Sequence, residues 1–452
     1  METLNNIVLT IQNYMSNYVL IIALLGAGLW FSFRLGFIQV RGFGEGMRRT
    51  FGGLFSKKGE AGADGMSSFQ ALATAIAAQV GTGNIAGAAT ALAIGGPGAI
   101  FWMWIAAFLG MATIYAEAIM AQKYKTVGAD GQVTGGPVYY IRAAFKGTFG
   151  KVLAGIFAIL ITLALGFMGN AVQSNSIAAS FHTAFGIPQW IMGLVVAVIA
   201  IFVFMGGMKR IAKVTETIVP FMAALYIIGS LIVIIYNYKN IPYAFASIFI
   251  GAFSPSSVVG GAAGATVKLA LTKGVARGLF SNEAGMGSTP HAHAVAKVDH
   301  PVEQGFVAMT GVFIDTFVVL NLTALVILTT KSIPSGKTGA ELSQYAFSTL
   351  YGKGGNIFIA ICMFFFAFST IIGWYFFGQA NVKYLFGPKA VKIYSVLAAV
   401  CVFLGSLAEV DLVWNMADCF NSLMVIPNIL ALFALSKVIS QVHKDYFKNF
   451  NK

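Results

Sequence analysis

The sequence predicts an all-α integral membrane protein that crosses the bilayer about 11 times, and three observations carry this prediction. Of its 452 residues, 58% are hydrophobic and only 10% are charged, whereas an ordinary soluble domain carries about 25% charged residues. Hydrophobic runs of about 20 residues, the length that crosses a bilayer as a helix, recur along the chain. The Lys and Arg residues cluster between alternate runs. Together these features exclude a soluble enzyme, a nucleic-acid-binding protein and a disordered chain.

Eleven hydrophobic runs are the expected transmembrane helices. The first run has no basic segment before it and no small-residue cleavage site after it, so we expect a retained helix rather than a signal peptide. The three cysteines lie in apolar stretches without a paired spacing, which indicates neither a disulfide framework nor a zinc site. The runs lie near residues 14–33, 66–94, 97–122, 152–181, 188–206, 214–236, 257–285, 304–330, 354–380, 391–408 and 411–436.

The positions of the basic residues predict the orientation of the chain. If the N-terminus lies outside, the inner loops and the tail carry 23 of the 29 Lys and Arg residues, and the outer segments carry 4. Lys268 and Lys273 lie within the seventh run. Because cytoplasmic loops of membrane proteins are enriched in Lys and Arg, we expect an outer N-terminus and a cytoplasmic C-terminus in the plasma membrane.

The second run departs near its middle from the composition of a plain spanning helix. Residues 77–87 read AAQVGTGNIAG and place two glycines and two amides at about the middle of the bilayer. An opened helix exposes N–H groups that favour an anion and carbonyls that favour a cation. This pattern suits an amino-acid carboxylate beside a sodium ion. The alternative is helix packing, because Gly83 and Gly87 also have the spacing of small residues at helix interfaces.

The seventh run has a similar character and suggests an internal repeat. It contains GGAAG at residues 260–264 and LTKGVARGLFSNEAGMG at residues 271–287. Interrupted helices at corresponding positions of two halves indicate a transporter site. Because the second run is expected to point outward and the seventh inward, the two halves would be inverted. The expected units are an N-terminal helix with its loop at 1–65, a first repeat at 66–236, a second repeat at 237–436 and a cytoplasmic tail at 437–452.

Two further runs carry polar side chains at membrane depth. In the fourth run Asn170, Gln173 and Ser174 share one helix face. They contact either a substrate or a neighbouring helix, and the pattern leaves both open. In the ninth run the hydroxyls of Ser369 and Thr370 either bond their own helix carbonyls or complete an oxygen cage for a small cation.

Two long motifs carry a resemblance to a known family. Residues 95–104, GGPGAIFWMW, and residues 274–287, GVARGLFSNEAGMG, closely resemble the sodium:alanine (alanine/glycine:cation) symporter family, and the resemblance extends over essentially the whole chain. The family is linked to the amino acid–polyamine–organocation superfamily. The resemblance therefore implies a LeuT-type fold, a 5+5 inverted repeat with one extra N-terminal helix.

The resemblance also implies roles for individual residues. A sodium site would use the backbone carbonyls of Ala77 and Val80 with the hydroxyls of Ser369 and Thr370. The substrate carboxylate would lie on the N–H groups of the opened second run, and the ammonium on carbonyls of an opening at residues 272–276. The implied substrate contacts are Gln79, Thr82, Gly83, Asn84, Phe167, Asn170, Gln173, Thr272, Gly274, Ala276, Ile371 and Trp374.

Lys273 and Asp315 are charged residues within predicted spans. A lysine at membrane depth costs roughly 3 kcal/mol. Lys273 therefore snorkels, mimics an ion or, as we expect, pairs with an acid such as Glu216 or Asp315. For Asp315 itself, a functional role and a structural pairing both remain open.

Two charged residues and two histidines lie near the end of the seventh run, and no specific binding role is needed to explain them. Arg277 and Glu283 form either a cytoplasmic gate or solvated loop charges. His291 and His293 lack a third ligand in the sequence, so we expect no metal site there.

The sequence therefore predicts a sodium-coupled symporter that imports small neutral amino acids, alanine or glycine, by alternating access. Proton coupling or amino-acid exchange is the alternative within transport. A channel is less favoured because no filter-like repeat is present, and an enzyme is not expected because no catalytic motif lies in the spans. We expect sodium as the coupling ion, no cofactor, the lipid bilayer as the environment and a monomer as the functional unit.

Overall fold

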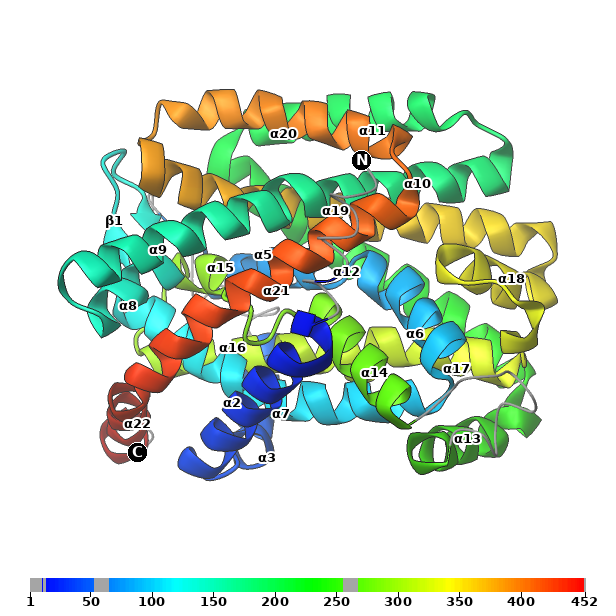
Figure 1. Ribbon diagram of the computed structural model, residues 1–452, viewed down its shortest axis with the longest axis horizontal. Helices are drawn as coiled ribbons and strands as arrows, with labels where there is room; N and C mark the ends of the chain where they lie inside the picture. The colour runs from blue at the N-terminus through cyan, green and yellow to red at the C-terminus, as the bar shows by residue number, and fades with distance from the viewer. Residues whose placement is uncertain (1–9, 11–13, 53–64, 255–266, 451–452) are drawn as a thin grey trace.

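A computed structural model describes residues 10, 14–52, 65–254 and 267–450, without the side chains of residues 16–17 and 410–413. Long helices run side by side along the longest axis of the molecule (Figure 1). The strands of the described part are a short antiparallel pair, β1 (Thr126–Val127) and β2 (Val133–Thr134), with Thr126 opposite Thr134. This β1–β2 hairpin lies at one end of the bundle with α8 (Pro137–Ala144) and α22 (Ser436–Asp445), and α13 (Ile241–Phe253) and α18 (Gly339–Tyr351) lie at the other (Figure 1).

The first half of the chain forms helices that match the first six hydrophobic runs. The fourth run is one continuous helix from Gly147 to Phe185 with a π-helical segment inside it. The elements are η1 (Met15–Val19), α2 (Leu20–Arg34), α3 (Ile38–Arg41), α4 (Phe43–Gly52), α5 (Ser68–Gln79), η3 (Gly83–Gly87), α6 (Ala88–Gly95), α7 (Gly98–Lys123), α9 (Gly147–Ile161), η4 (Thr162–Gly169), α10 (Asn170–Phe185), α11 (Gln189–Phe204) and α12 (Gly207–Tyr236).

The second half of the chain contains the remaining helices. The eighth run is again a long helix with a π-helical segment in its middle. The elements are η5 (Tyr238–Asn240), α14 (Val267–Asn282), α15 (Pro290–Ala294), α16 (Pro301–Val312), η7 (Phe313–Leu320), α17 (Asn321–Thr329), η8 (Ile333–Ser335), α19 (Lys353–Phe386), α20 (Ala390–Leu407), α21 (Val410–Ala434) and η9 (Tyr446–Phe450).

The helices confirm a multi-pass membrane protein. Seven described helices are long and apolar enough to cross a bilayer. Three more apolar helices are shorter, namely Leu20–Arg34, Gly83–Gly95 and Gln189–Phe204. The predicted count of eleven crossings therefore stays a prediction.

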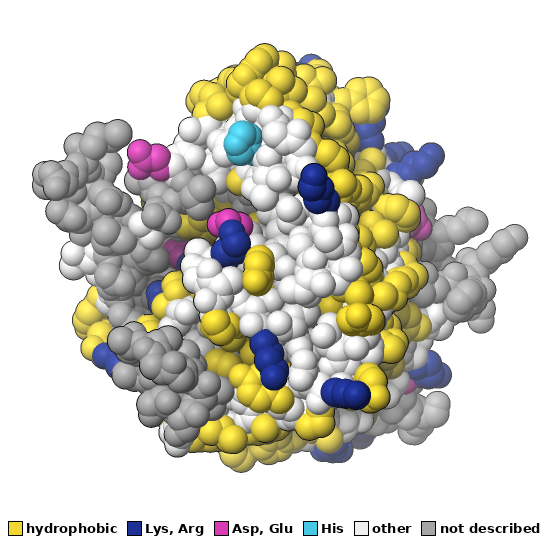
Figure 2. Space-filling view, turned by 90° about the vertical axis from the view of Figure 1, so that its right-hand side faces the viewer, with side chains coloured by type: hydrophobic (Ala, Val, Ile, Leu, Met, Phe, Trp, Pro, Cys, Tyr) yellow, Lys and Arg dark blue, Asp and Glu magenta, His cyan; other side chains and the backbone are white. Residues whose placement is uncertain are grey.

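The outer surfaces of several helices are apolar, as a lipid environment requires. On α11 and α20, Phe202 and Ile393 are each 66% exposed. The end face that carries α13 and α18 shows hydrophobic side chains around its edge and only scattered charges (Figure 2). Such exposed apolar side chains are stable in hydrocarbon and would be unfavourable in water.

The second hydrophobic run is broken, as the sequence predicts. A capping box at Ser67 begins α5, which ends at Gln79, and Val80 has a non-helical backbone with φ −83° and ψ 87°. The chain then re-enters a helix at η3. Gly81 is required at the break because a Cβ there would lie 2.3 Å from Thr370 Oγ1.

The seventh run corrects a prediction. The expected opening at residues 272–276 is wrong, because α14 is helical from Val267 to Asn282. Gly274 instead allows close packing on α7, since a Cβ there would lie 2.4 Å from the carbonyl oxygen of Ala99. The expected interruption at residues 260–264 lies outside the described residues.

The seventh run opens about ten residues later, between α14 and α15. Glu283, Gly285 and Gly287 have positive φ angles of 58°, 88° and 80°. We call residues 283–289 the unwound segment. The glycines tolerate this backbone, whereas Glu283 adopts it against its own preference, which is a marker of functional sites.

Several helices lie outside the predicted spans and were not expected from the sequence. Among them are α8, α13 and α18, of 8, 13 and 13 residues. Each is too short to cross a bilayer, so the hydrophobic-run criterion does not select it.

Candidate functional site

The break after α5 places backbone oxygens next to two hydroxyls of α19. Thr370 Oγ1 donates to the carbonyl oxygens of Ala77 at 2.9 Å and Phe366 at 3.0 Å. Ser369 Oγ donates to the Phe366 carbonyl at 2.8 Å and lies 3.4 Å from the Ala77 carbonyl. Val80, where the helix ends, is buried beside them. Neutral oxygens of this kind are the ligands that hard cations such as sodium prefer.

The opposite side of the break is held by amide side chains. The N–H of Gly81 donates to Asn84 Oδ1 at 3.0 Å, and the N–H of Thr82 donates to Gln173 Oε1 at 3.2 Å. Gln79 Nε2 donates to the carbonyl of Asn282 at 2.8 Å. The free N–H groups of the break are therefore bonded to side chains from the same helix and from α10, and α5 is tied to the end of α14.

Asp315, in the first turn of η7, connects both interrupted helices. Its Oδ1 accepts hydrogen bonds from Asn84 Nδ2 at 2.7 Å and from Ser281 Oγ at 2.9 Å. Its Oδ2 accepts from Thr316 Oγ1 at 2.8 Å. The carboxylate is fully buried, so it bridges η3 and α14 inside the bundle. The π-helical turn around it is typical of functional sites.

Several polar atoms around the break have no hydrogen-bond partner. Within the described residues, Gln79 Oε1, Thr82 Oγ1, Asn170 Oδ1 and Ser174 Oγ are buried and unbonded. Native proteins leave few buried polar atoms unpaired, because each costs about 1–3 kcal/mol. Two of these four atoms belong to the break, and two belong to α10.

The unwound segment is fixed by a carboxylate from α7. Glu117 accepts hydrogen bonds from the N–H groups of Gly285 at 3.0 Å and Gly287 at 2.9 Å. Asn428 of α21 donates to Glu117 Oε1 at 2.6 Å and to the Gly285 carbonyl at 2.9 Å. The hydroxyl of Tyr140 donates to Asn428 Oδ1 at 2.5 Å. The groups freed by unwinding are thus satisfied by helices distant in sequence.

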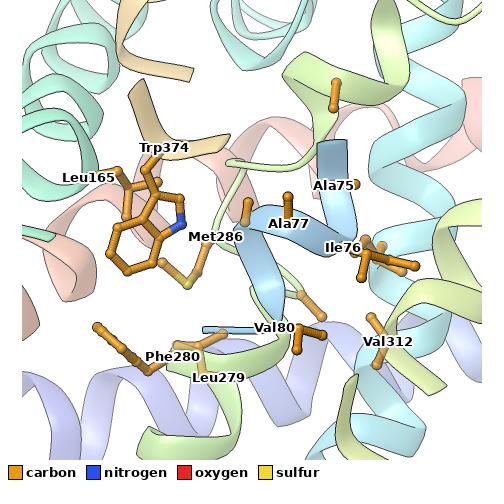
Figure 3. Packing of buried hydrophobic residues seen from close by; sticks show 14 of the residues in the cluster. Ala75, Ile76, Ala77, Val80, Leu165, Leu279, Phe280, Met286, Val312 and Trp374 are labelled. Atoms are coloured by element: carbon orange, nitrogen blue, oxygen red, sulfur yellow. The ribbon is translucent and has the colours of Figure 1, made fainter. Parts of the chain in front are cut away.

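Glu283 begins the unwound segment and contacts a predicted wall of the pocket. The indole N–H of Trp374 donates to Glu283 Oε1, and Ser288 Oγ donates to Glu283 Oε2 at 2.5 Å. The indole packs edge-on against Phe280 at 5.7 Å between ring centroids. Figure 3 shows it between Leu165, Met286 and Phe280. Trp374 and Glu283 therefore form one unit beside the break.

No basic side chain compensates the three buried acids. Among the described residues, no Lys or Arg forms an ion pair with Glu117, Glu283 or Asp315. All three are fully buried. Each accepts hydrogen bonds from neutral groups, which lowers but does not remove the cost of burying a charge.

The structure contradicts the pairing expected for Lys273. Asp315 bonds to Asn84, Ser281 and Thr316, and Glu216 accepts from a glutamine of α5, so neither pairs with Lys273. Arg277 pairs with Asp418 of α21 at 2.9 Å. Glu283 is fully buried, so it is not a solvated loop charge, and its role in a gate stays a prediction.

The histidines of α15 also differ from the expected loop. His291 and His293 are buried. His291 Nδ1 lies 2.7 Å from the Ser288 carbonyl, and His293 Nδ1 lies 2.8 Å from Gln304 Nε2. Within the described residues no group of three or more His, Cys, Asp and Glu side chains is arranged to hold a metal ion.

The predicted site residues divide into two sets. Those at the break lie together with α10 and α19, namely Ala77, Gln79, Val80, Thr82, Gly83, Asn84, Gln173, Ser369 and Thr370. Trp374 lies beside the unwound segment. Thr272, Gly274 and Ala276 lie within the uninterrupted α14, so their expected role as an opened backbone is wrong.

Three further predicted residues have other surroundings. The Phe167 ring lies against Tyr394 of α20 at 5.5 Å between centroids, because η4 turns it toward that helix. Asn170 Nδ2 donates to the Gly166 carbonyl of its own helix at 3.1 Å. Ile371 is fully buried in the apolar core.

The sequence analysis did not select Glu117, Ser281 or Asn428. All three are buried at the meeting point of helices far apart in the chain. Glu117 and Asn428 are polar residues inside predicted spans, and that signal alone could have marked them for inspection. Their partners could not be deduced, since they come from other helices.

Known proteins that are similar to this chain over most of its length are transporters. The chain is 42% identical over 457 residues to the sodium/alanine symporter AgcS of Methanococcus maripaludis, covering 98% of this chain and 99% of that protein. It is 41% identical over 447 residues to the probable sodium/glutamine symporter GlnT of Bacillus subtilis, covering 98% and 91%. A crystal structure of a mutant manganese transporter from Eremococcus coleocola is similar in fold, with a TM-score of 0.53 at 15% identity, covering 82% of this chain and 78% of that chain.

The family assignment covers the whole sequence. The profile of the sodium:alanine symporter family matches residues 1–452. The relatives align over nearly their full lengths, so the match is not confined to one motif. The chain therefore belongs to the sodium:alanine symporter family, a family of membrane transporters and not of enzymes.

Proposed function

We propose that this protein imports alanine and glycine together with sodium by alternating access around the break after α5. The observation that carries the proposal is the set of buried, unbonded polar atoms at Gln79 and Thr82 of the break and at Asn170 and Ser174 of α10, the helix whose Gln173 bonds to the break. A zwitterionic amino acid supplies both the donors and the acceptors that these atoms lack. The names of the relatives support alanine and sodium as its cargo.

The proposed sodium site uses the oxygens gathered at the end of α5. The carbonyls of Ala77 and Val80 and the hydroxyls of Ser369 and Thr370 would surround the ion. Without the ion, the hydroxyls donate hydrogen bonds to the Ala77 and Phe366 carbonyls. When sodium binds, the Thr370 hydroxyl would keep its proton and turn it away from the Ala77 carbonyl, so that both oxygens face the ion.

The proposed substrate site adjoins this sodium site. The N–H groups of Thr82 and Gly83 would hold the carboxylate, with Gln79, Asn84 and Gln173 around it and Trp374 as an apolar wall. Ion and substrate would order the same opened backbone. Each therefore lowers the cost of binding the other, and this coupling is reciprocal.

The proposed architecture is a LeuT-type 5+5 inverted repeat of eleven spans, with one extra N-terminal helix. The breaks after α5 and α14 would open the two repeats, at 66–236 and 237–436. The proposed orientation has the N-terminus outside and the C-terminus in the cytoplasm, because the hairpin end of the molecule joins the loops richest in Lys and Arg. A monomer holds every proposed contact.

Proton coupling is a second candidate, favoured by Glu117, Glu283 and Asp315. These three carboxylates are buried and have no basic partner among the described residues, so protons that neutralise one or more of them lower the electrostatic cost of burial.

Uptake of labelled alanine and glycine into proteoliposomes tests both candidates. Sodium and proton gradients are imposed separately at a fixed membrane potential. We expect accumulation only with an inward sodium gradient, and competition between the two amino acids. Accumulation driven by a proton gradient in sodium-free buffer would support the second candidate instead, and no accumulation under either gradient would contradict both.

A further inference from the structure

A cavity lies apart from the break, between the β1–β2 hairpin, α15 and the end of α19. Its volume is about 210 Å³, far above the roughly 10–15 Å³ that one water needs. Its wall includes Asp130, Val133, His291, Gln379 and Lys383. The size suits a ligand of a few heavy atoms rather than a drug-sized molecule.

The mouth of the cavity carries one acid and one base. Lys383 Nζ lies 2.5 Å from Asp130 Oδ2 and links the hairpin to α19, and the side chains remain 16% and 30% exposed. Burial by itself raises the pKa of Asp130, but the hydrogen bond and charge of Lys383 outweigh it, so the pKa is lowered. The lowered pKa keeps the Asp130 carboxyl ionised at neutral pH. Because partly exposed ion pairs contribute only about 0–1 kcal/mol, a ligand can separate this pair at small cost.

An unsatisfied acceptor lies in the wall of the same cavity. Gln379 Oε1 is buried, and among the described residues nothing donates a hydrogen bond to it. The cavity thus offers an ammonium (Lys383) and, as acceptors, a carboxylate (Asp130) and an unpaired amide oxygen (Gln379). These groups complement the carboxylate and the ammonium of an amino acid.

The cavity is connected to the candidate site by hydrogen bonds. His291 of its wall bonds to the Ser288 carbonyl, Ser288 bonds to Glu283, and Glu283 accepts from Trp374. A continuous chain of hydrogen bonds therefore joins the wall of the cavity to Trp374 beside the break after α5.

We propose that this cavity is a second, weaker binding site for a zwitterionic amino acid, in which Lys383 holds the carboxylate while Asp130 and Gln379 hold the ammonium. The inference rests on the proposed function, since it takes the transported amino acid as the ligand. The amino acid takes the place of the contact between Asp130 and Lys383, so that each charged group bonds to the ligand, and the bound ligand covers the cavity wall at Val133.

Protection of an introduced thiol from alkylation tests the proposal. Val133→Cys places the thiol in the cavity wall, and Lys146→Cys on the exposed surface serves as the control. In the starting protein Cys362, Cys401 and Cys419 are replaced by Ala. The purified full-length protein reacts with N-ethylmaleimide in sodium-free buffer, with and without alanine, and the labelling rate is measured.

We expect alanine to slow labelling at position 133 several-fold and to leave position 146 unaffected. Propionate, which lacks the ammonium, and alaninamide, which lacks the carboxylate, should not protect at the same concentration. Lys383→Met or Gln379→Leu should raise the half-protecting alanine concentration about tenfold, because each removes a charged or charge-assisted hydrogen bond. Equal protection by propionate, or no change in either variant, would overturn the proposal.

Two substitutions at the break after α5 distinguish binding in the cavity from binding at the break. In Asn84→Ala and in Thr370→Val, alanine should still protect position 133 with an unchanged half-protecting concentration. Loss of protection in both would show that the effect is transmitted from the other site and would overturn the proposal. Failure of the proposed function gives a different result, namely no accumulation of alanine in proteoliposomes under a sodium gradient.

Discussion

The buried carboxylate of Asp315 is hydrogen-bonded to one residue from each of the two interrupted helices. Asn84 reaches it from η3 and Ser281 reaches it from α14. Hydrogen bonds to a charged group are worth about 1.5–3 kcal/mol each, roughly twice those between neutral groups. One carboxylate therefore links the break after α5 to the end of α14, and the two helices cannot move independently while it is bonded.

Asp315→Asn should weaken sodium-dependent alanine binding about tenfold or more. One carboxylate oxygen of Asp315 becomes an NH2 group, which cannot accept the hydrogen bonds that Asn84, Ser281 or Thr316 now donate to that oxygen. At least one hydrogen bond of about 1.5–3 kcal/mol is therefore lost. Alanine binding to the purified protein at saturating sodium measures the effect. Asp299→Asn, an exposed change, is the control. Equal affinities in the two variants would remove Asp315 from the coupling of the helices.

Thr370→Val keeps the shape of the side chain and removes only its hydroxyl. If that oxygen is a sodium ligand, the sodium concentration for half-maximal alanine uptake should rise about tenfold, the effect of roughly 1.4 kcal/mol. Sodium titrations of uptake in proteoliposomes measure it. Thr349→Val on α18, whose hydroxyl bonds only its own helix, is the matched control. An unchanged sodium titration would place the ion elsewhere.

At the level of elements, glycines serve two opposite purposes in similar sequence contexts. Gly81 lies at a real break, where a side chain would collide with Thr370. Gly274 lies in an intact helix, where it allows α14 to approach Ala99 of α7. Both are small residues within apolar runs, and the difference comes from what the neighbouring helix presents.

Gly274→Ala should therefore destabilise the fold rather than alter substrate choice. Its Cβ would lie 2.4 Å from the Ala99 carbonyl oxygen and 2.9 Å from Trp102 Cβ, and overpacking costs about 1–3 kcal/mol. We expect a lower midpoint of thermal unfolding in detergent. Gly155→Ala in α9, with no neighbouring atom within 4 Å, should keep the midpoint of the parent protein. Equal midpoints for the two variants would contradict this packing.

On the scale of the whole molecule, the two ends of the bundle differ in charge. The hairpin end joins loops with many Lys and Arg residues, and the α13 and α18 end carries few (Figures 1 and 2). This asymmetry predicts which end faces the cytoplasm.

Cysteine labelling checks that orientation. In the cysteine-free background, Lys353→Cys should react with a membrane-impermeant thiol reagent in intact cells. Lys146→Cys should react only after permeabilisation. Both side chains are exposed, so accessibility to the reagent depends on the side of the membrane alone. The reverse pattern would invert the proposed topology.

Much of the helix layout could be predicted because its causes are local. The length of an apolar run and the weakness of Gly81-Thr82-Gly83 as a helix can be read from neighbouring residues, and the break after α5 is confirmed. The hydrogen-bond partners of the residues at the break could not be predicted from the sequence. Gln173 and Thr370 were selected as polar residues at membrane depth, and only the structure shows that Gln173 accepts from Thr82 and Thr370 donates to Ala77.

The sequence by itself determined a multi-pass membrane transporter of this family and the position of its first broken helix, because hydrophobicity, basic residues and a glycine-rich motif act over short distances. Tertiary structure alone decided that the seventh run opens at residues 283–289 rather than 272–276. It also decided that Asp315 is bonded to Asn84, Ser281 and Thr316 instead of Lys273. The physical reason is that burial, steric clash and hydrogen bonding at these positions come from helices far away in the chain.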